Sequence, residues 1–292
     1  CMEIHPFGNN SVLMLDLQAQ YIYYYEEIRN LLTEGGSFLY SWKRTLGGEF
    51  MGIIAYYGAS LYNFIFAIFP ENMTADAMMF INLMKIGSMG LTFGIYIHKT
   101  RNPGEMKTLA LSCMYALCSY AVVQTLDPMW LDALVYLPLM ILGLESLIKE
   151  RKVLLYIISL SLIIMANYYI GYMVCIYVAA YFFFYMLAFK GSANNPRNER
   201  AHFSRSFIRI ALFSALGVAI AAFVILGAYY SLSFGKNTFS SPNFTPKAKF
   251  EVLDFLTKFL PGAYDTVRPE GLPFVYTGLL TVILVPIFFL SK

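Results

Sequence analysis

The sequence has few charged residues. Asp, Glu, Lys and Arg make up 13% of its 292 residues, whereas hydrophobic residues make up 58%. An average soluble domain is about one quarter charged. The charges are also clustered, so long stretches of the chain carry almost none. This shortage of charge excludes a soluble globular domain and indicates an integral membrane protein.

Cysteine and histidine patterns typical of metal sites are missing as well. Neither a CxxC pair nor a Cys/His spacing of that kind is present, and the three histidines are scattered. The four cysteines are Cys1, Cys113, Cys118 and Cys175. The last three lie in apolar segments, so we expect them to be small packing residues. A metal requirement stays open, and the small net charge of +3 gives no support for nucleic-acid binding.

A secretory leader with a charged start and an apolar middle is also missing. The chain opens with the polar segment that begins Cys1-Met2-Glu3, and it stops at Lys292 directly after an apolar segment. Both ends resemble cuts in a longer chain. We therefore expect this sequence to be part of a longer membrane protein.

Long apolar stretches are abundant. A helix needs about 20 mostly apolar residues to cross roughly 30 Å of hydrocarbon. Candidate spans lie at about 77–97, 108–126, 131–148, 153–171, 172–189, 206–230 and 274–290. Strands of a membrane barrel would alternate apolar and polar residues, which these runs do not do. We predict an all-α polytopic membrane protein with a bundle of about seven helices over residues 77–292.

Positive charge predicts the orientation of this bundle. About half of the 21 Lys and Arg residues lie in three short segments, 99–107, 149–152 and 190–209. Basic loops stay in the cytoplasm. The outward loops are then residues 1–76, about 127–132, a tight turn at 167–172 and about 233–273. Residues 1–76 are then outside and the first predicted span runs inward, so this alternation requires a further helix before residue 1.

The first outer loop, residues 1–76, is predicted to carry juxtamembrane helices. Leu17, Tyr21, Tyr24, Ile28 and Leu31 recur at helical spacing and form one apolar face of an amphipathic helix over residues 12–34. Such a helix suits the membrane interface, and Gly35-Gly36 should end it. A second segment, about 47–69, ends at Pro70 and should not cross the membrane. The structural role open to Asp16 is that of a helix N-cap.

Short matches spread over nearly the whole chain resemble the YfhO family of bacterial membrane proteins. They are the segments 5–8 and 16–21, Ser41-Trp42 with Leu46-Gly47, Tyr56-Tyr57 with Ser60 and Asn63, residues 83–87, Trp130-Leu131-Asp132 with Leu137-Pro138, Asn167-Tyr168-Tyr169, and residues 260–265 with 271–274. Each match alone is weak, but their order makes the set specific.

The resemblance implies a fold and an activity. The family is similar to GT-C glycosyltransferases, which have a transmembrane helix bundle with interfacial juxtamembrane helices in the first outer loop. It implies transfer of a sugar from a polyprenyl-phosphate carrier to an envelope polymer such as lipoteichoic acid. The reaction would take place on the outer face of the bacterial cytoplasmic membrane. GT-C enzymes carry a key Asp or Glu in that loop, and Asp16 matches its position.

The chemistry of such a transfer selects candidate residues. A carboxylate must take the acceptor proton, and positive charge from a metal or from Lys or Arg must stabilise the departing phosphate. We predict Asp16 and Asp132 as catalytic residues, and we prefer Asp132 to Asp127 because Asp132 belongs to a family match. The predicted substrate-binding residues are Lys85, Gln20, Trp42, Asn167, Tyr168 and Asp265.

Lys85 is the charge that departs most from its apolar surroundings. It lies about nine residues inside a predicted span, where a central Lys costs about 2.5–3.5 kcal/mol. We expect Lys85 to meet either the phosphate of the lipid carrier or an acidic residue, in a cavity open to the outside.

Two other functions stay open. A transporter or flippase for a lipid-linked or envelope precursor would place ionisable residues near the middle of the membrane on broken helices. Lys85 is the one clear charge of that kind in the sequence, whereas the acidic residues gather in outer loops. A non-catalytic assembly protein would lose no chemistry when Asp16 is neutralised.

Overall fold

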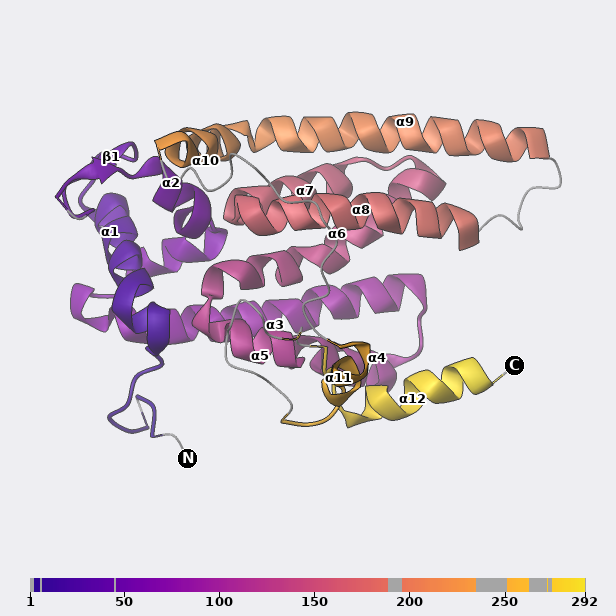
Figure 1. Cartoon of the computed structure of the whole chain (residues 1–292), viewed down its shortest axis with the longest axis horizontal. Coiled ribbons are helices and arrows are strands. Elements are labelled where there is room, and N and C mark those ends of the chain that lie inside the picture. The colour runs from indigo at the N-terminus through magenta and orange to yellow at the C-terminus, as the bar shows by residue number, and fades with distance from the viewer. Residues whose placement is uncertain are drawn as a thin grey trace.

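Helices make up most of the structure, which is a computed structural model. It describes residues 3–5, 7–44, 46–188, 196–234, 251–262, 272 and 275–291. The short elements of the first 73 residues gather at one end of the molecule, and longer helices extend from them (Figure 1). The described part of the chain contains a single two-stranded sheet, in which Tyr40 pairs with Glu49.

The amphipathic helix of the first loop is confirmed, with a local change in its winding. A π-helical turn, η1 (Leu17–Tyr21), leads into α1 (Ile22–Thr33). Leu17, Tyr21 and Ile28 are buried as predicted, and the buried face also takes in Ile22 and Tyr25. A π turn contains more residues per turn than an α-helix, so the face drifts toward Tyr25. Gly35 then follows the helix with a φ of 81°.

Residues 40–73 form short elements rather than one helix. They are β1 (Tyr40–Ser41), β2 (Gly48–Glu49), α2 (Met51–Ile53), η2 (Ile54–Gly58), η3 (Leu61–Ile68) and η4 (Glu71–Met73). The apolar segments 51–58 and 61–68 meet at an angle of 96°. Whether this bent pair crosses the membrane stays a prediction.

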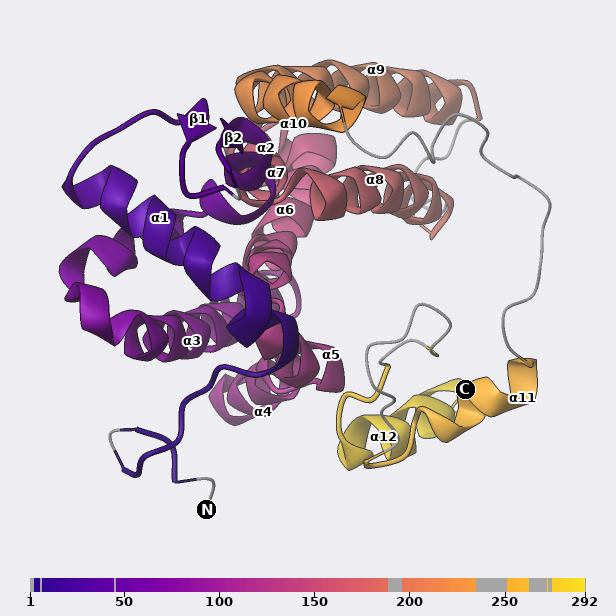
Figure 2. The same ribbon diagram turned by 60° about the vertical axis from the view of Figure 1, so that its left-hand side comes forward.

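The remaining helices form the bundle seen in Figures 1 and 2. Their bounds are α3 (Thr74–Thr100), α4 (Glu105–Ala116), α5 (Ser119–Val123), η5 (Gln124–Leu126), η6 (Pro128–Trp130), α6 (Leu131–Glu150), α7 (Leu154–Ala166), α8 (Tyr168–Ala188), α9 (Pro196–Ile220), α10 (Ala222–Phe234), α11 (Val252–Thr257) and α12 (Leu279–Leu290).

The chain is a polytopic helical membrane protein. In the described residues, four helices are long and apolar enough to cross a membrane, and two bent pairs raise that number to six. The predicted stretch 108–126 is one of those pairs, bent by 47° between α4 and α5. Helices α7, α10 and α12 are apolar but have 13, 13 and 12 residues, so these predicted spans are shorter than the sequence suggested.

Two predicted boundaries are wrong in detail. The turn expected at 167–172 is the single residue Asn167, because its side chain already caps α8 by accepting a hydrogen bond from the Ile170 backbone N–H. The predicted span 206–230 is broken at Ala221, between α9 and α10. Ala221 is fully buried, and Val224 and Ala228 beyond it pack with Ala55 of the first loop.

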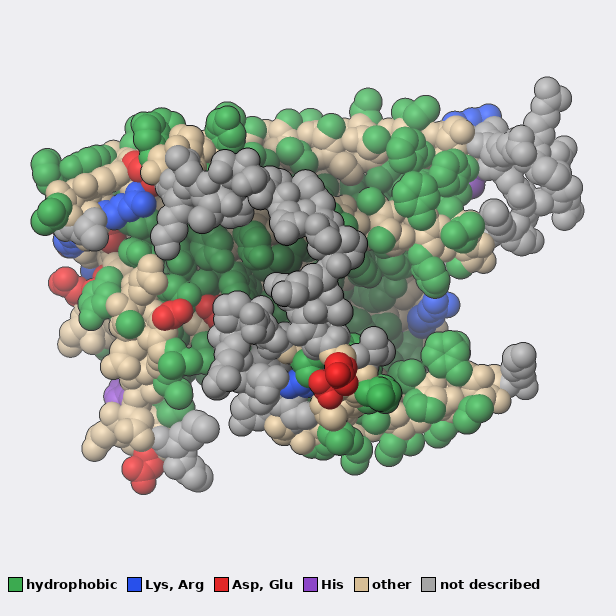
Figure 3. Space-filling view, in the orientation of Figure 1, with side chains coloured by type: hydrophobic (Ala, Val, Ile, Leu, Met, Phe, Trp, Pro, Cys, Tyr) green, Lys and Arg blue, Asp and Glu red, His purple; other side chains and the backbone are tan. Residues whose placement is uncertain are grey.

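Helix α6 is the centre of the bundle. It lies between α3 on one side and the α7–α8 pair on the other (Figures 1 and 2). The largest core cluster is formed by α6, α7 and α8, with Met140, Leu144 and Tyr156 fully buried. In contrast, hydrophobic side chains cover much of the face shown in Figure 3, and its charged side chains lie toward the two ends and in one group near the lower edge. That distribution suits a bundle whose sides face lipid.

The close packing of α6 on α7 at Gly143 leads to a prediction about stability. A Cβ at Gly143 of α6 would lie 2.5 Å from the backbone nitrogen of Tyr156 and 2.7 Å from its Cα, whereas a Cβ at Gly87 of α3 would meet nothing within 4 Å. We expect Gly143→Ala to destabilise the protein by about 1–3 kcal/mol, because backbone must move. Gly87→Ala should be neutral, or stabilising by about 0.5–1 kcal/mol.

Denaturation in detergent micelles measures this difference. The two variants add the same methyl group to two transmembrane glycines, so Gly87→Ala controls for helix propensity. Equal stability of the two variants would contradict the close packing of α6 on α7.

Candidate functional site

Asp16 lies at the outer surface, directly before η1. Its backbone is already helical, with φ −64° and ψ −27°, and its carboxylate caps no backbone N–H of the helix. An N-cap residue has extended backbone angles and accepts such a bond. The structural role considered for Asp16 is therefore wrong. Its exposed carboxylate instead lies 3.5 Å, through Oδ2, from the hydroxyl of Tyr21.

Asp127 is the second carboxylate at this place. It lies between η5 and η6, and only 7% of the residue is exposed. The Tyr21 hydroxyl also lies close to its carboxylate. Burial raises the pKa of Asp127, the Tyr21 hydroxyl lowers it, and the negative charge of Asp16 raises it. Tyr21 thus lies close to both an exposed carboxylate and a nearly buried one, and we call Asp16, Tyr21 and Asp127 the acidic site.

Tyrosine rings surround the acidic site. The ring of Tyr57 lies 5.1 Å, between centroids, from those of both Tyr21 and Tyr24. Tyr56 continues the chain of rings, at 4.8 Å from Tyr57 and 5.8 Å from Tyr168. We call these five residues the tyrosine cluster. It connects the predicted residue Tyr168 to Tyr21 through the rings of Tyr56 and Tyr57.

Two further predicted residues support this cluster. Gln20 is exposed, and its Nε2 donates to the Tyr24 hydroxyl over 2.9 Å. Asn167 is 2% exposed, and its Nδ2 donates to the Tyr56 carbonyl over 3.0 Å while its Oδ1 caps α8. Because both ends of this amide are occupied by backbone, Asn167 holds the cluster in place. A direct contact between Asn167 and substrate stays a prediction.

Lys85 and Asp132 form an ion pair inside the protein. Lys85 Nζ lies 2.5 Å from Asp132 Oδ2, and the two side chains are 2% and 0% exposed. Lys85 also donates to the Pro128 carbonyl over 2.8 Å, and Asp132 accepts a 2.6 Å bond from the hydroxyl of Ser60. Lys85 therefore meets an acidic residue, which is one of the two partners expected. It does so in a closed environment rather than in an open cavity.

The start of α6 explains why the carboxylates of Asp132 and Asp127 point toward different partners. Asp132 belongs to the first turn of α6, where the helix dipole favours a negative charge, and it is directed inward at Lys85. Asp127 precedes that helix and is directed toward Tyr21 of the first loop. The burial of Asp132 argues against direct contact with a substrate, so its predicted catalytic role gains no support from its position.

The other predicted site residues lie elsewhere. Trp42 follows β1, is 78% exposed, and stands edge-on to Tyr40 at 5.2 Å between ring centroids. Asp265 lies outside the described residues. Sequence reasoning missed the part played by Tyr21, which it assigned to an apolar helix face, and it preferred Asp132 to Asp127 because Asp132 belongs to a family match. The signal available for Asp127 was its position in a loop directly before a proline.

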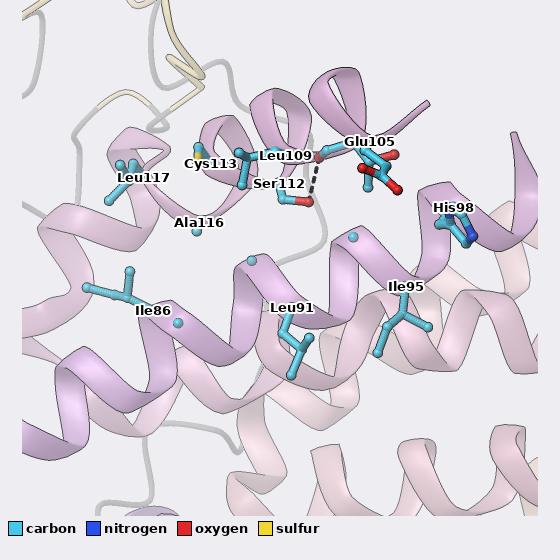
Figure 4. A pocket seen from close by; sticks show the side chains of 14 residues that line it. Ile86, Leu91, Ile95, His98, Glu105, Leu109, Ser112, Cys113, Ala116 and Leu117 are labelled. Atoms are coloured by element: carbon cyan, nitrogen blue, oxygen red, sulfur yellow. Dashed lines mark hydrogen bonds between the residues drawn. The ribbon is translucent and has the colours of Figure 1, made fainter. Parts of the chain in front are cut away.

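A groove of about 690 Å³ lies between α3 and α4, away from these residues (Figure 4). Ile86, Leu91, Ile95 and Leu117 contribute to its apolar walls, and the Ser112 hydroxyl within it donates to the Thr108 carbonyl. None of the predicted site residues lines the groove. Its apolar character suits contact with lipid chains, and the polar chemistry of the molecule lies at the acidic site.

Within the described residues, no group of three or more His, Cys, Asp or Glu side chains is placed to hold a metal ion.

Comparisons with known proteins agree with the helical membrane architecture. The family model described as "Bacterial membrane protein YfhO" matches residues 1–292. A curated relative, the "Uncharacterized protein YfhO" of Bacillus subtilis (strain 168), is 23% identical over 203 residues, which cover 65% of this chain and 23% of the relative. The chain thus matches less than one quarter of that relative's length. No solved structure matches the chain significantly. The chain belongs to the YfhO family of bacterial membrane proteins.

Proposed function

We propose that this protein is a GT-C-type glycosyltransferase. It moves a sugar from a polyprenyl-phosphate carrier to an envelope polymer such as lipoteichoic acid. The observation that carries the proposal is the acidic site, in which the exposed Asp16 and the nearly buried Asp127 both lie close to the Tyr21 hydroxyl. The family resemblance supplies the substrate class, and the geometry supplies a place for its chemistry.

Asp16 is the general base in this proposal. The acceptor hydroxyl attacks the anomeric carbon of the sugar while Asp16 takes the hydroxyl proton. The new bond joins the acceptor oxygen to the anomeric carbon, and the bond from that carbon to the phosphate oxygen breaks. Its electron pair leaves with the polyprenyl phosphate. Asp16 suits this role because it is exposed to an arriving acceptor and is not used as a helix cap.

Asp127 takes the place that sequence reasoning gave to Asp132. It lies close to the Tyr21 hydroxyl, which also hydrogen-bonds to Asp16. Like charges repel, so uptake of a proton by Asp127 relieves repulsion between the two carboxylates. The departing phosphate needs positive charge, which a metal ion or a Lys or Arg side chain would supply.

The tyrosine cluster suits a donor that has a polar sugar and an apolar polyprenyl chain. Tyrosine has an apolar ring and a polar hydroxyl, and it is favoured where membrane meets water. Tyr24, Tyr57 and Tyr168 are partly buried members of the cluster around Asp16. Their rings offer surfaces on which a sugar can stack, and Gln20 offers an amide beside them.

Transport is the second candidate, and one observation favours it. Ionisable groups within a membrane often mark the path of a transported substrate, and the Lys85–Asp132 pair is such a feature. The pair is, however, closed and hydrogen-bonded to Ser60 and the Pro128 carbonyl. A flippase mechanism would have to open it during each cycle.

Neutralising Asp16 tests the proposed base. Asp16→Asn keeps the size of the side chain and removes its charge, so transfer of sugar from a polyprenyl-phosphate donor should fall by roughly 10²–10⁴-fold. Glu34→Gln is the matched control, since Glu34 is an exposed carboxylate at the far end of the same helical segment. Radiolabelled donor and proteoliposomes provide the assay.

Near wild-type transfer by Asp16→Asn, in protein that inserts and folds normally, would reject the role of Asp16. Loss of transfer in Asp16→Asn and Glu34→Gln alike would show that the effect is not specific to the acidic site. Repeating the assay with a chelator shows whether a divalent cation is needed.

The location of the site on the outer face can be tested separately. Lys99 of α3 and Lys149 of α6 lie in the last turns of their helices, and basic loops face the cytoplasm. In a background without cysteine, Glu34→Cys should react with an impermeant maleimide in intact cells, whereas Asn102→Cys should react only after the cells are opened. The reverse pattern would place Asp16 on the cytoplasmic side.

A further inference from the structure

The segment that carries Asp127 has little regular structure of its own. Asp127 joins the short turns η5 and η6 and has φ −120° and ψ 64°, outside the helical region. Its backbone N–H donates to the Gln124 carbonyl, and its carbonyl accepts from the Trp130 N–H. Pro128 has no N–H to donate. Contacts from outside the segment must therefore fix the place of the Asp127 carboxylate.

Helix α3 supplies two such contacts from one face. Asn82 and Lys85 are three residues apart, so their side chains lie one above the other on the helix. Asn82 Nδ2 donates to the Thr125 carbonyl over 3.1 Å, and Lys85 Nζ donates to the Pro128 carbonyl over 2.8 Å. These two carbonyls lie on either side of Asp127 in the chain. Helix α3 thus hydrogen-bonds to the backbone on both sides of Asp127.

Both contacts are shielded from water. Asn82 is 6% exposed and Lys85 is 1% exposed. A hydrogen bond from a charged donor is roughly twice as strong as a neutral one, and in a dry environment few alternative partners compete for it. Asp132 neutralises Lys85 from the other side. This pairing allows a charged side chain to remain at this depth and to hold a backbone carbonyl.

We propose that Asn82 and Lys85 are positioning residues that set the place of the Asp127 carboxylate beside Tyr21 and Asp16. The proposal rests on the proposed function for the consequence in sugar transfer, but not for the placement itself. It gives Lys85 a role through the backbone of residues 125 and 128, in place of direct contact with the lipid phosphate. Asp132 acts in turn on Lys85.

The chemistry of Asp127 provides a measurement of its placement. Its carboxyl is nearly buried beside another negative charge, and both raise its pKa. A segment released from α3 would give the carboxyl more water and more distance from Asp16, so the pKa should fall toward the ordinary value. Side chains whose charge or ionisation bears on Asp127 are Asp16, Tyr21, Tyr25, Tyr56, Tyr57 and Tyr120.

Two variants release the segment without leaving a charge unpaired. Asn82→Leu removes the donor to the Thr125 carbonyl. The double variant Lys85→Met with Asp132→Leu removes both members of the ion pair, because one buried charge left alone is strongly destabilising. Tyr156→Phe is the control, since it loses one buried hydrogen bond, to Ser214, between α7 and α9. Lys85→Arg keeps the charge and tests conservative rescue.

The reconstituted protein is treated with a carbodiimide across a pH series, and modification of Asp127 is followed by peptide mass spectrometry. We expect the midpoint of modification to move to lower pH in Asn82→Leu and in the double variant, and to stay unchanged in Tyr156→Phe. Lys85→Arg should keep the midpoint near that of the wild type. With a transferable donor, kcat should fall at least tenfold in the two releasing variants while KM for the donor changes less than twofold.

An unchanged midpoint in both releasing variants, in protein that unfolds at the wild-type temperature, would overturn the proposal. The midpoint does not depend on sugar transfer. A shifted midpoint in a protein without transferase activity would therefore support the positioning role and reject the proposed function. A shifted midpoint with unchanged kcat would uphold the positioning role and remove Asp127 from the proposed reaction.

Discussion

The ion pair between Lys85 and Asp132 is the constraint on which the end of the molecule near the first 73 residues depends. A charge inside a membrane protein is tolerated when it is paired and hydrogen-bonded, and removing one partner of a buried pair leaves the other uncompensated. The 2.5 Å contact therefore fixes the separation of α3 and α6 at this level. Ser60 adds the first loop to the same junction through its 2.6 Å bond to Asp132. Three parts of the chain, distant in sequence, are joined at one buried charge.

Side chains complete the hydrogen bonding of the irregular backbone around this junction. Backbone groups within a bilayer find no water, so they need partners from the protein. Asn63 donates to the carbonyls of Tyr57 and Gly58, and Asn167 donates to that of Tyr56. These amides hold the bent segment of the first loop, in which the π-helical turn η2 carries the rings of Tyr56 and Tyr57.

Most of the long helices could be predicted from the sequence, because a helix that crosses the hydrocarbon needs a long run of apolar residues. The sequence also identified Lys85 as an outlier, Asn167 as the break in a long apolar segment, and Asp16 as the carboxylate of the first loop. It preferred Asp132 to Asp127 on a family match and could not show which of the two lies close to Asp16. Their roles depend on where α6 begins and on which neighbour each side chain faces, and that information lies in the packing of α6 against α3 and the first loop. The division of residues 206–230 into α9 and α10 has the same origin, since the break follows from packing against residues of that loop.

The different surroundings of Asp127 and Asp132 also separate the functions that each can serve. Asp132 is the buried partner of Lys85, and loss of either member would leave a charge unpaired in a dry interior, so Asp132 serves the stability of the fold. Asp127 faces another carboxylate and a tyrosine hydroxyl, and protonation there relieves repulsion. A reaction that moves a proton needs a group whose charge can change during the cycle. In the proposed reaction Asp127 is the carboxylate that meets this condition, and Asp132 has the structural role of pairing with Lys85.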